Sequence, residues 1–330
     1  MAAASKPSGT VIAIVGATGT GKSALAVNLA KKLVEAGTAA EIVSADAMQL
    51  YRGMDIGTAK ITPPEMHGIT HHMLDVLDPH QEATVAAYQL SARAVVEQIH
   101  SRRGVAVVVG GSGLYVNGLL YDFQFPGSDP KYRETLNARH TSSGLTPLID
   151  ELLEKDPEAQ HTVDLNNPRR VIRALEVLHV TGRPMASQLP EAPRPVWPTL
   201  VVGIAEDREV LVQRLDDRVT EMWRDGIVAE TEKLIPQGIR HSPTAGRAIG
   251  YAQALAQIEG EMTEAEAIAQ TQFLTRRYAR RQVSWFKRLP QIHWITSEQS
   301  QSEQTQEQLL RMWQQLAAGD TPQTQKQDIA

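Results

Sequence analysis

Residues 16–23 read Gly-Ala-Thr-Gly-Thr-Gly-Lys-Ser, and this stretch decides the fold. The spacing matches G-x-x-x-x-G-K-[ST], the P-loop pattern, in which glycines permit a tight turn and backbone N–H groups point at phosphate oxygens. The apolar run Thr10–Val15 before it predicts a buried strand, and a helical pattern after it stops at Gly37. The expected phosphate-binding residues are Gly16, Ala17, Thr18, Gly19, Thr20, Gly21, Lys22 and Ser23.

The ligand of this loop is a di- or triphosphate together with Mg²⁺. Lys22 supplies a point charge, the Ser23 hydroxyl is placed for Mg²⁺, and the following helix adds its positive N-terminal end. The motif alone leaves the reaction open. Most P-loops hold a nucleotide for phosphoryl transfer, and others simply hold a diphosphate.

Further strand patterns at Glu41–Ser44, Val105–Val109 and Thr199–Ile204 alternate with helical ones. This alternation predicts an α/β fold with a P-loop NTPase-like parallel sheet core. Polar, helical and proline-punctuated sequence interrupts it and predicts a helical insertion domain. We expect core residues 1–127, the insertion 128–198, core residues 199–296 with C-terminal helices, and a glutamine-rich flexible tail 297–330.

Composition narrows the class of protein. The chain has 330 residues, 42% of them hydrophobic, so it can bury a sizeable core. It contains no cysteine, which excludes disulfides and thiolate metal sites, and its net charge of −5 argues against a globally basic RNA-coating protein. We expect no membrane span, a cytoplasmic location and a monomer.

Two side chains are expected beside the P-loop. Asp46 follows the second strand, at the edge of an open α/β sheet where ligands bind, and can act as a general base or bind metal through water. Its alternative role is to cap a helix. Ser112 lies in the turn Gly110-Gly111-Ser112-Gly113 and can offer a hydroxyl to the ligand. This turn fails as a dinucleotide fingerprint because Val116 replaces the last glycine.

Two arginine clusters suit RNA phosphates. One comprises Arg169, Arg170 and Arg173, and the other lies in the segment 276–288 together with Trp285 and Phe286. A solvated helix face with local salt bridges explains the same charges, so the pattern leaves both interpretations open.

Seven stretches together resemble the bacterial tRNA dimethylallyltransferase (tRNA prenyltransferase) family. They are GATGTGKS, SADAMQLYRGMDIGTAK, HHMLDVLDP, VVGGSGLY, NNPRRVIRALEV, AGRAIGY and RRYARRQVSWF, and the resemblance as a whole runs from about Val11 to Trp294. The resemblance implies transfer of a dimethylallyl group from dimethylallyl diphosphate to N6 of the adenosine just 3′ of the anticodon. It also implies a P-loop-like core and an insertion that helps to hold the anticodon stem-loop.

The resemblance also implies roles for single residues. Asp46 corresponds to the general base, while Lys22, Mg²⁺ at Ser23 and Arg218 would neutralise the departing diphosphate. Ser112 stands where many members carry threonine, so the hydroxyl is kept. The tRNA-contacting positions implied by the resemblance are Asp46, Ala47, Met48, Gln49, Ser112, Arg133, Arg169, Arg170, Arg173, Arg247, Gly250 and Tyr251.

Three alternatives remain at this point. A small-molecule or nucleoside kinase shares the P-loop and the aspartate, but it should also carry an arginine-rich lid for ATP. A prenyltransferase acting on free adenine nucleotides would not need the insertion with Arg169 and Arg173. A non-enzymatic P-loop RNA-binding protein would not need Asp46.

Overall fold

The computed structural model describes residues 9–184, 193–289 and 291–319. It divides into two compact units, one formed by the described residues up to Leu120 and from Pro195 onward, the other by Tyr121–Arg194. None of the described helices is long and apolar enough to cross a membrane.

The larger unit is built on a six-stranded sheet in the order β3-β2-β4-β1-β5-β6, and every neighbouring pair is parallel. The strands are β1 (Val11–Gly16), β2 (Ala40–Ser44), β3 (His71–His72), β4 (Val105–Gly110), β5 (Thr199–Ala205) and β6 (Ile292–Thr296). All residues of β1 and β4 are buried, as their unbroken apolar sequence predicts for central parallel strands. The predicted α/β class and parallel sheet are confirmed.

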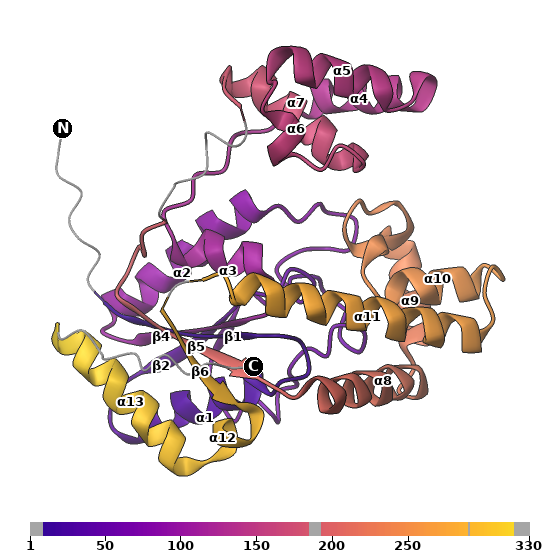
Figure 1. Ribbon diagram of the computed structural model, residues 1–330. Helices are drawn as coiled ribbons and strands as arrows, with labels where there is room; N and C mark the ends of the chain where they lie inside the picture. Colours follow the sequence, from indigo (N-terminus) through magenta and orange to yellow (C-terminus); the bar gives the residue numbers. More distant parts are fainter. Residues whose placement is uncertain (1–8, 185–192, 290, 320–330) are drawn as a thin grey trace. The chain divides into compact units, whose positions relative to one another are not determined.

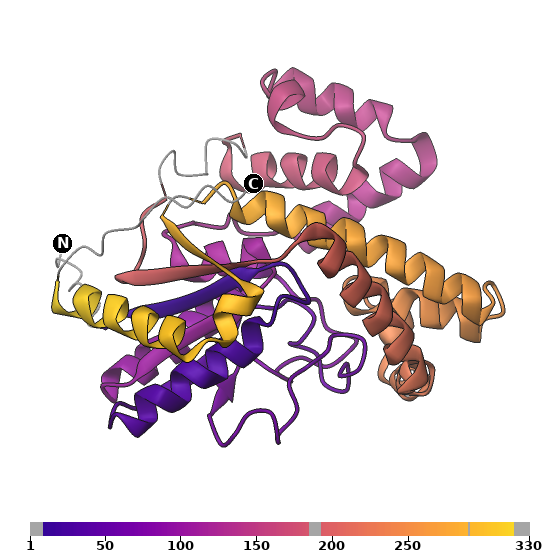
Figure 2. The same ribbon diagram turned by 60° about the horizontal axis from the view of Figure 1, so that its bottom comes forward.

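Helices cover both faces of this sheet. On one face lie α2 (Val85–Ser101), α3 (Gly113–Leu120) and part of α11 (Glu264–Phe286), and on the other lie α1 (Lys22–Glu35) and α13 (Glu303–Ala318) (Figure 1). In Figure 2 the indigo α1 and the yellow α13 lie side by side beneath the sheet. The sheet is therefore buried on both sides, which a parallel sheet requires.

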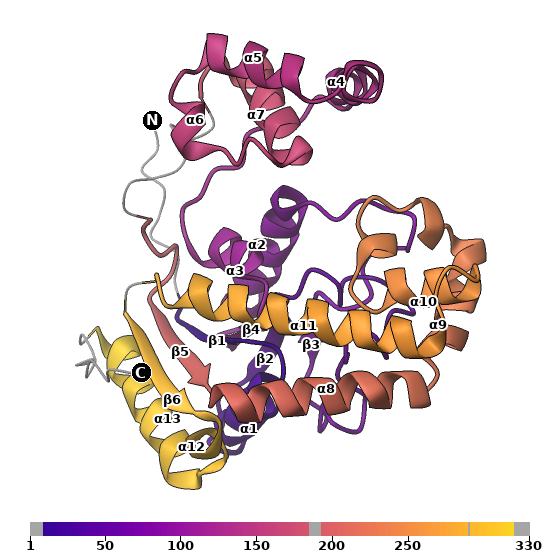
Figure 3. The same ribbon diagram turned by 45° about the vertical axis from the view of Figure 1, so that its right-hand side comes forward.

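A helical layer extends from the carboxyl edge of the sheet. It contains α8 (Arg208–Arg224), α9 (Ile227–Leu234), α10 (Tyr251–Ile258) and α11, with 3₁₀ turns at Ile235–Gln237, Ile239–His241 and Ala245–Arg247. Figure 3 shows α8 and α11 running alongside each other, and Arg276 of α11 binds both carboxylate oxygens of Asp216 of α8 at 2.6 and 2.7 Å. A capping box of Thr263 and Glu266 opens α11.

The smaller unit contains α4 (Pro130–Ser143), α5 (Thr146–Lys155), α6 (Ala159–Thr162) and α7 (Pro168–Thr181). Asn167 caps α7 and Pro168 is its first residue, a pair typical of a helix start. The core of this unit is formed by Leu136, Leu148, Leu152, Val171 and Leu175 with their neighbours.

The boundaries of the smaller unit differ from the expected 128–198. It begins at Tyr121, and next to this boundary the Asp122 N–H donates to the Arg194 carbonyl at 3.0 Å while the Arg194 N–H donates to the Asp122 carboxylate at 2.8 Å. Trp197 belongs to the larger unit, because it is 1% exposed and packs edge-on against His100. Part of the expected insertion, residues 185–192, lies outside the described residues.

The expectation of a flexible tail at 297–330 is wrong for the described residues to 319. Helix α12 (Ser297–Gln301) and α13 follow β6, and Leu309, Met312 and Trp313 are buried in the main core. Trp313 Nε1 also donates a 2.8 Å hydrogen bond to Thr10 Oγ1. These three apolar side chains are spaced three and four residues apart, so they share one face of the helix. That face is enough to pack the helix against the core, although many glutamines surround it. Residues 320–330 lie outside the described residues.

We predict that Trp313→Ala lowers the free energy of unfolding by about 3–5 kcal/mol, because a buried indole is lost from the core. The measurement is chemical denaturation followed by circular dichroism. Gln314→Ala, on the exposed side of the same helix, is the matched control and should change stability by less than about 0.5 kcal/mol. Equal stability of both variants would show that α13 does not support the core.

Candidate active site

The P-loop connects β1 to α1. Gly21 has a φ of 87°, a left-handed conformation that favours glycine, and α1 begins at the next residue. The Thr20 hydroxyl closes the turn with a 2.9 Å bond to the Ala17 carbonyl. The first turn of α1 therefore presents its free N–H groups toward the loop, which is the arrangement that binds phosphate.

Lys22 is the cation inside this loop. Its Nζ donates to the Ala17 carbonyl at 2.6 Å. Burial lowers the pKa of the Lys22 ammonium to about 8; the Asp46 carboxylate opposes this shift and the Arg218 guanidinium adds to it. An anion at this position would restore the balance of charge around Lys22.

Helix α8 supplies two arginines to the P-loop. Arg218 donates to Thr18 Oγ1 at 3.2 Å, and Arg214 donates to the Gly19 carbonyl at 2.7 Å. Burial lowers the pKa of Arg218, while Asp46 raises it. Sequence reasoning missed Arg214. Its signal was the four-residue spacing from Arg218, which puts both side chains on one face of a helix.

Asp46 lies just beyond the end of β2. Its Oδ1 accepts a 2.9 Å hydrogen bond from the Met48 N–H, but no helix starts here, so this is a bond within the loop and the helix-capping alternative is wrong. The neighbouring Ala47 N–H donates to Ser112 Oγ at 3.2 Å, and the Tyr278 hydroxyl lies 3.3 Å from the same Ser112 atom. Ser112 thus links the loops that follow β2 and β4.

Lys22, Arg218 and Asp46 meet around one small cavity of about 230 Å³. It is lined by Thr18, Gly19, Gly21, Lys22, Ser23, Ala24, Asp46, Gln49, Thr58, Ala59, Val109, Gly110, Gly111, Arg218 and Gln282. The expected Lys22, Ser23, Asp46 and Arg218 are therefore brought together. An exposed serine hydroxyl and a carboxylate at a phosphate loop suit Mg²⁺, which takes few protein ligands and several phosphate or water oxygens.

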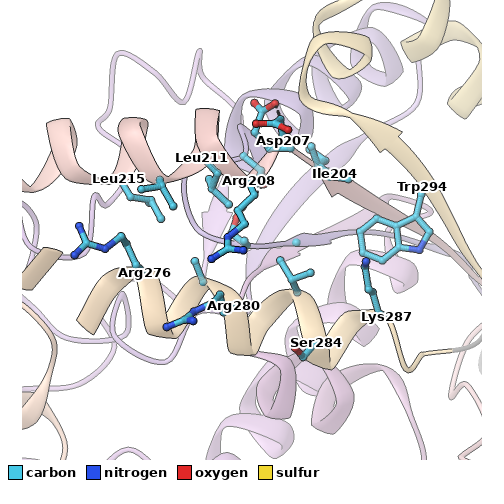
Figure 4. Close-up of a pocket in the computed structure, with 18 of the residues that line it drawn as sticks. Ile204, Asp207, Arg208, Leu211, Leu215, Arg276, Arg280, Ser284, Lys287 and Trp294 are labelled. Carbon is cyan, nitrogen blue, oxygen red and sulfur yellow. Dashed lines mark hydrogen bonds between the residues drawn. The ribbon is translucent and has the colours of Figure 1, made fainter. Parts of the chain in front are cut away.

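A second, larger cavity of about 1060 Å³ lies between α8 and α11 (Figure 4). It reaches Gly16, Ala17 and Thr20 of the P-loop. Its wall combines apolar side chains such as Leu211 and Leu215 with charged ones, namely the cations Arg208, Arg276, Arg280 and Lys287 and the carboxylates Glu206 and Asp207. Because the cations outnumber the carboxylates, the lining suits a ligand with an apolar part and a negative charge.

The arginines expected to bind RNA in the smaller unit divide into two pairs. Arg133 and Arg173 both contact the fully buried Glu176 carboxylate, Arg133 at 3.1 Å and Arg173 at 2.7 Å, so their charges already compensate a buried anion. Arg169 and Arg170 are exposed, and Arg170 lies 3.6 Å from Asp164. The second pair is the better placed for phosphates.

The other residues expected to contact tRNA differ in their exposure to solvent. Arg247 is exposed, whereas Tyr251 is fully buried and cannot touch RNA directly. The Tyr251 hydroxyl donates to Glu230 at 2.5 Å and accepts from the Gly57 N–H at 3.2 Å. Gly250 is buried and donates its N–H to Gln253. Tyr251 and Gly250 therefore support the loops rather than bind the ligand.

Ala47, Met48 and Gln49 lie partly exposed in the loop after Asp46. Gln49 donates to the Thr58 carbonyl at 3.3 Å and accepts from the Ser44 hydroxyl at 3.1 Å. Its side chain therefore holds this loop against residues 58–59, while the loop still presents a surface next to Asp46.

We predict that affinity for inorganic diphosphate falls as the pH rises above about 8, since Lys22 then loses its charge. The loss should approach about tenfold per pH unit until the pKa of the complex is reached. Calorimetric titration of wild type and Lys22→Arg at each pH gives the test. The arginine stays charged, so the ratio of the two affinities removes the titration of diphosphate itself. A ratio that does not change with pH would contradict the assignment.

The family model described as IPP transferase matches residues 49–289. The chain is 52% identical to a tRNA dimethylallyltransferase of Clavibacter sepedonicus over 84% of this chain and 90% of that protein. It is 49% identical to one of Kineococcus radiotolerans over 88% of this chain and 92% of that protein.

Solved structures agree with this match. A tRNA isopentenylpyrophosphate transferase of Bacillus halodurans superimposes with a TM-score of 0.65 and 36% identity, covering 94% of this chain and 96% of that one. A eukaryotic dimethylallyltransferase acting on tRNA gives a TM-score of 0.80 and 26% identity, covering 97% and 82%. The chain therefore belongs to the IPP transferase family.

Proposed function

We propose that this protein transfers the dimethylallyl group of dimethylallyl diphosphate to N6 of the adenosine that follows the anticodon in tRNA. The observation that carries the proposal is the small cavity in which the Asp46 carboxylate faces Lys22 and Arg218 of the phosphate site. A base and a diphosphate holder in one cavity are what an alkyl transfer from a diphosphate needs. Relatives named tRNA dimethylallyltransferase support the choice of substrates.

The donor half of the site stabilises the leaving group. The free N–H groups of the P-loop, Lys22 and Arg218 hold the diphosphate and oppose the negative charge that grows on it as the C1–O bond breaks. Mg²⁺, when bound through Ser23 and the phosphate oxygens, adds Lewis-acid charge stabilisation. No phosphoryl group moves in this reaction.

The acceptor half of the site handles one proton. N6 of the adenosine attacks C1, the electron pair of the C1–O bond leaves with the diphosphate, and Asp46 takes the proton from N6. The bond from the Met48 N–H to Oδ1 fixes the orientation of this carboxylate, which leaves its other oxygen for the substrate amine. An unpaired loop base can reach such a site at little unstacking cost.

The acceptor that we propose is the anticodon loop of a tRNA, which also places the reaction in the cytoplasm. In the smaller unit, Arg169 and Arg170 are the exposed cations that suit its phosphates. In the larger unit, the partly exposed segment Ala47–Gln49 adjoins Asp46 and can meet the nucleotides beside the target.

Incubation with unmodified tRNA, Mg²⁺ and radiolabelled dimethylallyl diphosphate should place label in the tRNA. Asp46→Asn should slow this transfer about 10²–10⁴-fold, because the base is lost. The amide oxygen of the new side chain can still accept from the Met48 N–H, so tRNA affinity should stay within about threefold.

Two results would sink the proposal. Label that enters only AMP would point to a prenyltransferase of free nucleotides, and ATP hydrolysis without transfer would point to a kinase-like enzyme. Normal turnover of Asp46→Asn at saturating tRNA would leave the reaction intact but remove Asp46 as its base.

A second prediction separates RNA contacts from structural arginines. Arg169→Ala and Arg170→Ala should each lower the salt dependence of tRNA binding by about one unit of log K against log salt, with little change in stability. Arg173→Ala leaves the buried Glu176 with one cationic partner fewer and should destabilise the smaller unit by about 1–3 kcal/mol. Filter binding at several salt concentrations and thermal denaturation measure the two effects. The opposite pattern would show that Arg173 is the phosphate contact.

A further inference from the structure

Gln282 lies on the buried side of α11, where its amide joins two loops that are distant in sequence. Its Oε1 accepts from the Thr18 N–H of the P-loop at 2.9 Å, and its Nε2 donates to the Gly111 carbonyl after β4 at 2.8 Å. The side chain is only 4% exposed. The bond to Gly111 is buried and the bond to Thr18 is partly buried, so neither partner exchanges its bond for solvent without a cost.

The contact with the β4 loop requires a glycine. A Cβ atom at Gly111 would lie 2.3 Å from Gln282 Nε2, closer than side chains approach each other. Gly113, two residues further along the chain, is restricted in the same way, because a Cβ atom there would lie 2.3 Å from the Trp285 ring. The sequence Gly110-Gly111-Ser112-Gly113 thus lets α11 sit directly on this loop.

The same face of α11 also reaches the acceptor side of the cavity. Tyr278, four residues before Gln282, has its hydroxyl 3.3 Å from Ser112 Oγ, which in turn accepts from the Ala47 N–H beside Asp46. Burial raises the pKa of Tyr278 to about 12, so the hydroxyl stays neutral. One stretch of helix is therefore bonded to the P-loop, to the β4 loop and, through Ser112, to the loop that carries Asp46.

We propose that Gln282 is a positioning residue that sets the distance between the diphosphate holder and the Asp46 side of the cavity. This inference rests on the transfer reaction proposed above, in which C1 of the donor must stand in line with N6 of the acceptor. Gln282 contributes no charge and takes no proton. Its amide can accept one hydrogen bond through Oε1 and donate another through Nε2. The side chain can therefore connect the Thr18 N–H with the Gly111 carbonyl.

Misplacement of reacting atoms by about 1 Å costs up to about 100-fold in rate. We therefore expect Gln282→Met, which keeps the volume and loses both bonds, to lower kcat about 10–100-fold. The dissociation constants for tRNA and for dimethylallyl diphosphate should change less than about threefold, because the groups that bind them remain. A loss confined to kcat is the signature of misalignment.

Gln272→Met is the matched control. Gln272 lies on the same helix and donates a 3.1 Å hydrogen bond to the Asp216 carbonyl of the neighbouring α8. It is not bonded to the P-loop or to the loop after β4. This variant should keep kcat within about twofold. Comparable losses in both variants would show that α11 packing as a whole, and not Gln282, supports the reaction.

Gln282→Glu separates the two bonds. A carboxylate of the same length still accepts from the Thr18 N–H but cannot donate to the Gly111 carbonyl. Hydrogen exchange should therefore show the Thr18 amide protected in wild type and Gln282→Glu and unprotected in Gln282→Met. Both variants should have a reduced kcat. Wild-type turnover by Gln282→Glu would overturn the inference, since the link to Gly111 would then be irrelevant.

The exchange measurement does not depend on activity. If wild type transfers no label to tRNA, the proposed function fails, whereas exchange at Thr18 still reports whether Gln282 holds the P-loop. If wild type is active and both Gln282 variants turn over normally, only the positioning role fails.

Discussion

The parallel register of β1, β2 and β4 is the constraint on which the rest of the site depends. Val15 pairs with Gly110 and Ser44 pairs with Val109, so the three strands end at the same level of the sheet. The loops that leave them carry the phosphate site, Asp46 and Ser112 respectively. Because adjacent strands lie about 5 Å apart, these loops start within reach of one another before any side-chain contact forms. A shift of one residue in either pairing would move Asp46 or Ser112 to the wrong face.

A sheet edge alone would leave the P-loop open on one side, and the α8–α11 pair closes it. Arg214 and Arg218 of α8 bond to Gly19 and Thr18, while Gln282 of α11 bonds to the Thr18 N–H. The two helices are joined to each other by the ion pair of Arg276 with Asp216, in which the single nitrogen Nη1 contacts both carboxylate oxygens. Such a pair holds the two helices together at this point, which suits a role in fixing orientation more than a role in stability.

The sequence predicted those parts of the site that are local, and it missed those that are long-range. The P-loop and the position of Asp46 at a strand end each follow from a few neighbouring residues. In contrast, Gln282 acts 264 positions away from Thr18, and no local pattern encodes that pairing. Arg133 and Arg173 have the charge expected of RNA contacts, but both form ion pairs with the buried Glu176 of the same unit. Helix α13 was not predicted, because its composition is mostly polar and its apolar residues form only a narrow stripe along one face.

The charges around the small cavity explain why its two halves must be held at a fixed distance. The Lys22 and Arg218 cations share this cavity with the Asp46 carboxylate, and the lowered pKa of Lys22 shows that Asp46 alone does not offset its burial. A diphosphate improves the surroundings of both cations, but its negative charge repels the Asp46 carboxylate. Too short a distance would therefore cost electrostatic free energy through like-charge repulsion, and too long a distance would separate C1 from the amine. A neutral side chain that is hydrogen-bonded to both loops, as Gln282 is, keeps them at a fixed distance without adding a charge.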